Sequence, residues 1–230
     1  MNVPGLFVVG TDTGVGKTVI AAALILYLRD RGVNVGAFKP VESGGTQDST
    51  FLREAAGGED PPEIANPYSF SQPISPHQAA EEEGREISIS TILDAFESLK
   101  QRHDYIIAEG AGGLLVPLRR DFLIGDLIAR LGLPVLVVAR AAVGTINHTL
   151  LTVKQAQSLG LRVLGVIINC EKPVSDCESV SKPEEMTHFM DVPVLGKFPY
   201  LDSLKAEILQ KALVENLDLS NLRLPGMQEK

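Results

Sequence analysis

The sequence has few of the features that mark secreted, membrane or metal-binding proteins. Its 230 residues include only two cysteines, Cys170 and Cys177, with no CxxC spacing and no clustered histidines, so thiols are expected rather than a metal site. No apolar stretch approaches the length of a membrane span, and the longest, residues 131–138, is expected to be a buried strand. The N-terminus has no basic segment typical of a signal peptide. We therefore expect a cytoplasmic protein with no membrane partner.

Positive charge is also scarce. Lysine and arginine number 21 against 29 acidic residues, giving a net charge of −8 with no long basic run. This balance disfavours a nucleic-acid or anionic-membrane partner. Hydrophobic residues make up 44% and charged residues 22% of the chain, which is enough for one sizeable core and argues against long disorder. The length suits a single domain over residues 1–230.

Short apolar runs alternate with helical patterns along the chain. The runs contain few polar residues, as expected for strands that are buried on both faces. The predicted strands are 6–9, 35–38, 105–108, 135–139, 163–168 and a weaker 194–195; the predicted helices are 17–30, part of 48–56, 90–102, 124–131, 145–160 and 184–190. This alternation predicts an α/β fold with a doubly wound, mostly parallel sheet and helices on both faces.

Glycines at 32, 132 and 160 are typical of helix ends, and Ser90 is predicted to cap the helix that follows it. Two stretches break the alternation. Residues 44–90 are long for a connection, so they are expected to be functional or partly helical. Residues 170–183 are expected to form a mobile surface loop, and the tail after Leu213 is expected to be loosely packed or to form a peripheral turn.

The strongest motif is the glycine-rich stretch of residues 10–18, GTDTGVGKT, between a predicted strand and a predicted helix. Small residues let the backbone wrap a phosphate group, and the following helix start is positive. Lys17 would contact the β- and γ-phosphates of ATP, and the Thr18 hydroxyl would bind Mg²⁺. The pattern departs from the strict P-loop motif at Thr11, where that motif has glycine. It nevertheless predicts a P-loop NTPase.

Two further motifs follow predicted strands. FKPVESG (38–44) places Lys39 where strand ends line the ligand crevice, although position alone also fits a surface lysine. EGAGG (109–113) ends a strand with Glu109, which suits a magnesium ligand or an ordinary strand end. Asp48 fits equally well a metal ligand and a charge that favours the helix dipole.

The ordered set GTDTGVGKT, FKPVESG and EGAGG resembles the dethiobiotin synthetase family, and NPY…SPH (66–77) and GTINHT (144–149) agree with it. The resemblance covers about residues 5–201. It implies that 7,8-diaminononanoate takes up CO₂ to form a carbamate, which attacks the γ-phosphate of ATP. The neighbouring amine then closes the ring of dethiobiotin, an intermediate of biotin biosynthesis, with release of ADP and phosphate. The resemblance also implies a Mg²⁺ cofactor and a homodimer.

The resemblance assigns roles by matching position. Lys17 and Lys39 are the expected catalytic lysines, and Thr18, Asp48 and Glu109 the expected metal ligands. The expected ATP-binding residues are Gly14, Val15, Gly16, Lys17, Thr18, Val19, Asp48, Glu109, Gly110, Ala111, Gly112, Asn169, Cys170, Pro199, Tyr200 and Leu201. The expected substrate-binding residues are Thr13, Ser43, Gly113, Gly144 and Asn147, the last two at a helix start that in the family binds the substrate carboxylate across a dimer interface.

Within these assignments, Asn169 matches an asparagine that recognises adenine, although it also fits a strand-end cap. Cys170 stands where the family often has aspartate, and Gly14 replaces a glutamate of some members. Three other interpretations fit the sequence less well. A cobyrinate-type amidoligase would carry a glutaminase domain, for which this chain is too short. A partition-type ATPase would have a lysine in place of Asp12, and a binding module without activity would not need Lys17, Thr18, Lys39 and Glu109 together.

Overall fold

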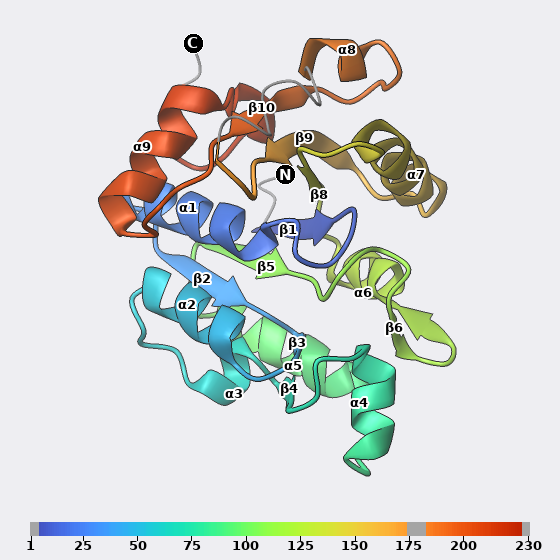
Figure 1. Cartoon of the computed structure of the whole chain (residues 1–230). Helices are drawn as coiled ribbons and strands as arrows, with labels where there is room; N and C mark the ends of the chain where they lie inside the picture. Colours follow the sequence, from blue (N-terminus) through green and yellow to red (C-terminus); the bar gives the residue numbers. More distant parts are fainter. Residues whose placement is uncertain (1–4, 174–182, 227–230) are drawn as a thin grey trace.

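A six-stranded parallel sheet forms the centre of the protein (Figure 1), whose computed structural model describes residues 5–173 and 183–226. The strand order is β10-β9-β8-β1-β5-β2, and every neighbouring pair is parallel. The strands are β1 (Gly5–Gly10), β2 (Val35–Phe38), β5 (Tyr105–Glu109), β8 (Val135–Arg140), β9 (Val163–Asn169) and β10 (Val194–Phe198). All six coincide with predicted apolar runs, which confirms the expected fold class.

Helices cover both faces of this sheet (Figure 1). On one face lie α1 (Lys17–Asp30), α2 (Gln47–Ala55) and α9 (Ala206–Asn216); on the other lie α5 (Ile89–Lys100), α6 (Ile124–Leu131) and α7 (Thr145–Ser158). Strand β1 supplies both cores because its side chains alternate: Leu6 and Val8 pack with α1, whereas Phe7 and Val9 pack on the opposite face.

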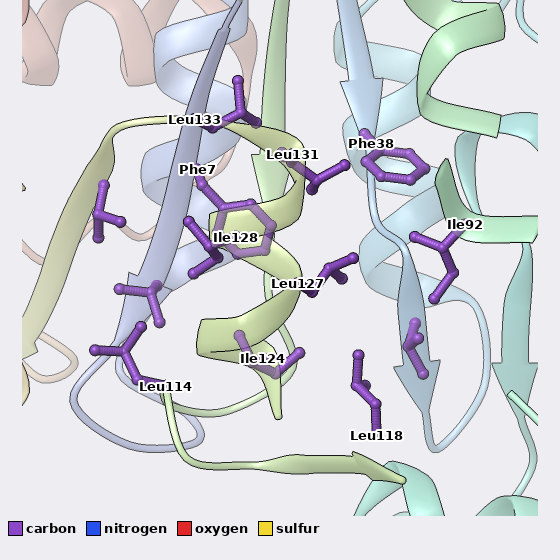
Figure 2. Packing of buried hydrophobic residues seen from close by; sticks show 14 of the residues in the cluster. Phe7, Phe38, Ile92, Leu114, Leu118, Ile124, Leu127, Ile128, Leu131 and Leu133 are labelled. Atoms are coloured by element: carbon purple, nitrogen blue, oxygen red, sulfur yellow. The ribbon is translucent and has the colours of Figure 1, made fainter. Parts of the chain in front are cut away.

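Helix α6 shows how an amphipathic pattern becomes packing. Its buried side chains Ile124, Leu127, Ile128 and Leu131 recur at spacings of three and four residues, so they lie on one face of the helix. Figure 2 shows them gathered beside Phe7 of β1, within one apolar cluster. The helix ends at Gly132 in the left-handed conformation, as the sequence predicted.

The long segment between β2 and α5 is partly helical, as expected. It contains α2, α3 (Pro62–Ala65) and α4 (Pro76–Glu82), and its strands β3 (Val41–Ser43) and β4 (Tyr68–Phe70) form a small parallel sheet. A hairpin of β6 (Pro117–Arg119) and β7 (Phe122–Leu123) precedes α6. The remaining short elements are α8 (Pro183–Thr187) and a 3₁₀ turn at Ser220–Leu222.

Two local predictions were wrong. Ser88, and not Ser90, caps α5: its hydroxyl accepts from the Thr91 N–H at 3.3 Å, while Ser90 lies inside the helix. The tail after Leu213 is not loosely packed, since α9 continues to Asn216 and Leu217, Leu219, Leu222 and Leu224 are buried against the α1 side of the core. The predicted loop falls largely on residues 174–182, including Cys177, outside the described residues. Among the described helices, none is long and apolar enough to cross a membrane.

The strand order brings three motifs to one edge of the sheet. β5 lies between β1 and β2 and pairs in parallel with both. The carboxyl ends of these three strands therefore point the same way, and the segments that follow them meet at that edge. Residues 10–18 follow β1, Lys39 follows β2, and Glu109 is the last residue of β5.

Candidate active site

The P-loop connects β1 to the start of α1. Gly14 and Gly16 have φ of 74° and 89°, left-handed values that glycine adopts without strain, and Gly16 is the cap residue of the helix. A Cβ at Gly16 would also collide with the side-chain amide of Asn169. No acidic side chain lies in the first turn of α1, so its positive end remains available to an anion. The geometry suits a phosphate group.

One lysine, two acids and a threonine form a polar cluster beside this loop. The Lys39 ammonium donates to Glu109 Oε1 at 2.5 Å and to Asp48 Oδ2 at 3.0 Å. The Thr18 hydroxyl donates to the same Glu109 oxygen at 3.0 Å. The Lys39 and Glu109 side chains are 4% and 0% exposed, whereas Asp48 is 47% exposed. The structure thus brings together four residues that sequence analysis singled out.

The two lysines of the site differ in their electrostatic environment. Burial lowers the pKa of Lys17 below the ordinary 10.5, and the positive charge of Lys39 lowers it further, against the opposing effect of Glu109. Burial also acts to lower the pKa of Lys39, but the carboxylates of Glu109 and Asp48 outweigh it and the net pKa is raised. Lys17 makes only a long contact, 3.4 Å, with the carbonyl of Asp12. Lys39 therefore has two carboxylate partners, whereas the ammonium of Lys17 is available to bind an anion.

The turn after β5 packs directly on the P-loop. The Gly10 N–H donates to the Gly112 carbonyl at 3.3 Å, and a Cβ at Gly113 would approach the Gly10 carbonyl to 3.3 Å. The Ser43 hydroxyl at the end of β3 is buried and has no hydrogen-bond partner among the described residues. A buried hydroxyl without a partner is costly unless a ligand satisfies it.

The comparisons with known proteins agree with this geometry. A family described as an AAA domain matches residues 4–208. The ATP-dependent dethiobiotin synthetase of Methanococcus vannielii is 46% identical over 195 residues, 83% of this chain and 91% of its own length. That of Bacillus licheniformis is 38% identical over 221 residues, 94% of each chain. The chain belongs to the ATP-dependent dethiobiotin synthetase family.

Solved structures of proteins with much lower sequence identity share the fold. The septum site-determining protein MinD complexed with Mg-ADP from Pyrococcus horikoshii is 18% identical, with a TM-score of 0.60 over 92% of this chain and 94% of that chain. A chain of the MinC:MinD cell division protein complex of Aquifex aeolicus gives a TM-score of 0.55 at 17% identity, over 90% of this chain and 86% of that chain. At such identities the likeness concerns the fold alone, which is that of P-loop NTPases.

In this dethiobiotin synthetase family member, the expected base-binding residues lie at the ends of β9 and β10. The Asn169 amide donates to the Val15 carbonyl of the P-loop at 3.0 Å, so it braces that loop with one N–H. Its other N–H and its oxygen remain compatible with adenine. The Cys170 N–H donates to the Phe198 carbonyl, which brings residues 199–201 beside it; Tyr200 is 38% exposed. The role of these residues in binding the base stays a prediction.

The expected carboxylate-binding helix start lies apart from the lysine–acid cluster. Gly144, with φ of 90°, caps α7, and Asn147 is exposed in its first turn. No hydrogen bond or ion pair of the described residues joins either of them to Lys39, Glu109 or Asp48. Their assignment depends on a second copy of the chain and stays a prediction.

Sequence analysis did not identify two charged residues that shape the site. Glu42 is 5% exposed, and its two oxygens accept from the main-chain N–H groups of Asp48 and Ser49 at 2.8 and 3.0 Å. Arg140, the last residue of β8, donates to the Thr13 carbonyl at 2.9 Å and lies 3.5 Å from Asp12 Oδ2. Glu42 stands within the FKPVESG motif and Arg140 directly follows the predicted strand 135–139, but neither position by itself indicates these contacts.

Proposed function

We propose that this chain catalyses the dethiobiotin synthetase reaction. It would convert 7,8-diaminononanoate, CO₂ and ATP into dethiobiotin, ADP and phosphate, through a carbamate and a carbamic–phosphoric anhydride. The observation that carries the proposal is the buried lysine–acid cluster beside a P-loop, in a chain whose relatives share this name. Phosphoryl transfer depends on positioning and charge neutralisation, and these residues are suited to both.

Different residues of the chain would have different roles in the reaction. The loop of residues 14–19 would wrap the phosphates, with Lys17 on the β- and γ-phosphates. Lys39 would stabilise the charge that develops as the carbamate oxygen attacks the γ-phosphate. Thr13, Ser43 and Gly113 would hold the diamine end of the substrate, and the partnerless Ser43 hydroxyl supports this placement.

The donor set of the site fits Mg²⁺. Thr18, Asp48 and Glu109 offer the hard oxygen ligands that this ion prefers, and Glu109 Oε2 is buried without a hydrogen-bond partner among the described residues. The described chain holds no group of three or more His, Cys, Asp or Glu side chains suited to a metal, so the phosphates and water would complete the shell. When bound, the ion neutralises phosphate charge.

We further propose a single domain over residues 1–230 that acts as a homodimer in the cytoplasm. In the dimer, Gly144 and Asn147 at the start of α7 would bind the substrate carboxylate beside the second copy's cluster. The exposed Val143, with 91% of its surface accessible, next to this helix start supports a partner contact there. Asn169, Cys170, Pro199, Tyr200 and Leu201 would hold the adenine base.

The decisive experiment measures ADP release with ATP, Mg²⁺ and bicarbonate, with and without diaminononanoate. We expect release that depends on the diamine and yields dethiobiotin by mass spectrometry. Lys211→Ala, at an exposed position on α9, serves as the matched control for lysine substitutions and should keep full turnover. ATP turnover that is indifferent to the diamine would contradict the proposal and favour a nucleotide-dependent switch ATPase.

A further inference from the structure

The Lys39 ammonium contacts carboxylate oxygens of two residues proposed to bind the metal ion, Glu109 and Asp48. It contacts Glu109 Oε1 at 2.5 Å and Asp48 Oδ2 at 3.0 Å, and the Thr18 hydroxyl is a second donor to Glu109 Oε1. These three residues are the metal ligands assigned under the proposed function. Glu109 Oε2 is the one buried oxygen of this pair of acids without a partner among the described residues.

Lys39 and a metal ion would compete for Glu109 Oε1 and Asp48 Oδ2. Mg²⁺ binds its ligands at about 2.0–2.1 Å and demands near-octahedral geometry. An ammonium within hydrogen-bond distance of both acids would then lie close to the ion. Two positive charges that close, in a site where Lys39 and Glu109 are almost fully buried, repel strongly.

We propose that Lys39 is a displaceable counter-ion that excludes divalent metal from Glu109 and Asp48 until nucleotide phosphates offer the ammonium another partner. The inference rests on the proposed function, because it takes the metal ligands from it. It adds an order of binding. The metal binds together with the nucleotide and not before it. Lys39 then leaves the carboxylates and contacts the terminal phosphate.

The energetics of burial make this transfer conditional. A buried ammonium without an anionic partner is strongly unfavourable, so Lys39 leaves the acids only when another anion is within reach. Its four-carbon stem is flexible enough for a short move toward residues 14–18. Binding of metal and of nucleotide is therefore coupled through Lys39, and the coupling is reciprocal.

The test measures Mn²⁺ binding by electron paramagnetic resonance, without nucleotide, to the full chain and to three variants. Mn²⁺ takes the same oxygen ligands as Mg²⁺. Lys39→Met removes the ammonium at similar length, and we expect Mn²⁺ to bind about 5- to 150-fold more tightly than to the unsubstituted chain. Lys39→Arg keeps the charge and should keep binding weak.

Lys17→Met is the matched control. It removes one positive charge from the same crevice, but the Lys17 ammonium contacts the Asp12 carbonyl and neither metal-binding acid. We expect a clearly smaller gain for this variant. When a non-hydrolysable ATP analogue is added, the difference between Lys39→Met and the unsubstituted chain should shrink, because the terminal phosphate then holds Lys39.

Equal Mn²⁺ affinity of Lys39→Met and the unsubstituted chain, or an equal gain from Lys17→Met, would overturn the proposal. If Lys39→Met is unstable, its melting temperature provides the second measurement: Mn²⁺ should raise it more than it raises that of the unsubstituted chain. An equal rise overturns the idea. None of these measurements uses the diamine, so they fail independently of the turnover assay that tests the proposed function.

Discussion

Removal of the Glu42 carboxylate should loosen the helix that presents Asp48. Glu42 accepts from the N–H groups of Asp48 and Ser49, the second and third residues of α2, and the formal cap residue Thr46 makes no side-chain cap bond. Loss of a helix cap costs about 0.5–2 kcal/mol, and each hydrogen bond to a charged group about 1.5–3 kcal/mol. Water can reach the half-exposed Asp48 but not the buried Ser49. We expect Glu42→Ala to lower the free energy of unfolding by about 2–3 kcal/mol.

Urea unfolding followed by circular dichroism measures this loss. Glu54→Ala, at an exposed position of the same helix, is the control and should change the free energy of unfolding by less than about 0.5 kcal/mol. Glu42→Gln should lie between the two, since its amide keeps one acceptor oxygen and turns a donor toward the other N–H. A loss in Glu42→Ala no greater than in Glu54→Ala would refute the idea that Glu42 holds the start of α2.

Three further predictions concern the site itself. Lys39→Ala should lower kcat by about 10²–10³-fold while the far-UV spectrum is kept, and near-normal kcat would remove its assigned role. Thr18→Val loses the hydroxyl that lies 3.0 Å from Glu109 Oε1 and should raise the Mg²⁺ requirement; an unchanged Mg²⁺ titration would contradict this. Because the pKa of Lys17 is lowered from 10.5 and a phosphate needs its charged form, ATP binding should take up a proton at alkaline pH below 10.5 and weaken as pH rises there. Calorimetry in buffers of different ionisation enthalpy measures this uptake, and buffer-independent heats would argue against it.

The central sheet could be predicted from the sequence because its strands are buried on both faces. Such strands appear as near-continuous apolar runs, and the run at 105–108 is an example that the structure extends by one residue to Glu109. That acid is also the last residue of its strand, so its place at the ligand edge followed from the sheet topology. Lys39 could be placed by the same rule, since it comes directly after β2.

Other features depend on contacts between side chains and distant parts of the chain, and the spacing of residues in the sequence does not reveal such contacts. An acid in a short strand such as Glu42 gives no sign that it caps a helix six residues later, because local capping rules concern residues adjacent to the helix start. The prediction of Ser90 as the cap failed because Ser88, two residues earlier, is an equally suitable residue type. Likewise α9 gains its stability from packing on α1, a long-range contact that its weak apolar pattern does not show.

Lys17 and Lys39 are both buried but differ in their partners, which explains how a buried site can still bind an anion. Each lysine is largely enclosed, yet the pKa of one is lowered and that of the other raised, so burial alone does not set their behaviour. The difference lies in partners: Glu109 and Asp48 compensate Lys39, whereas Lys17 contacts only a carbonyl. An incoming phosphate therefore gains most from Lys17, whose charge is least compensated. Under the proposal, contact of the phosphate with Lys39 would require that Glu109 and Asp48 first release the ammonium, so Lys39 would respond to a ligand that Lys17 already binds.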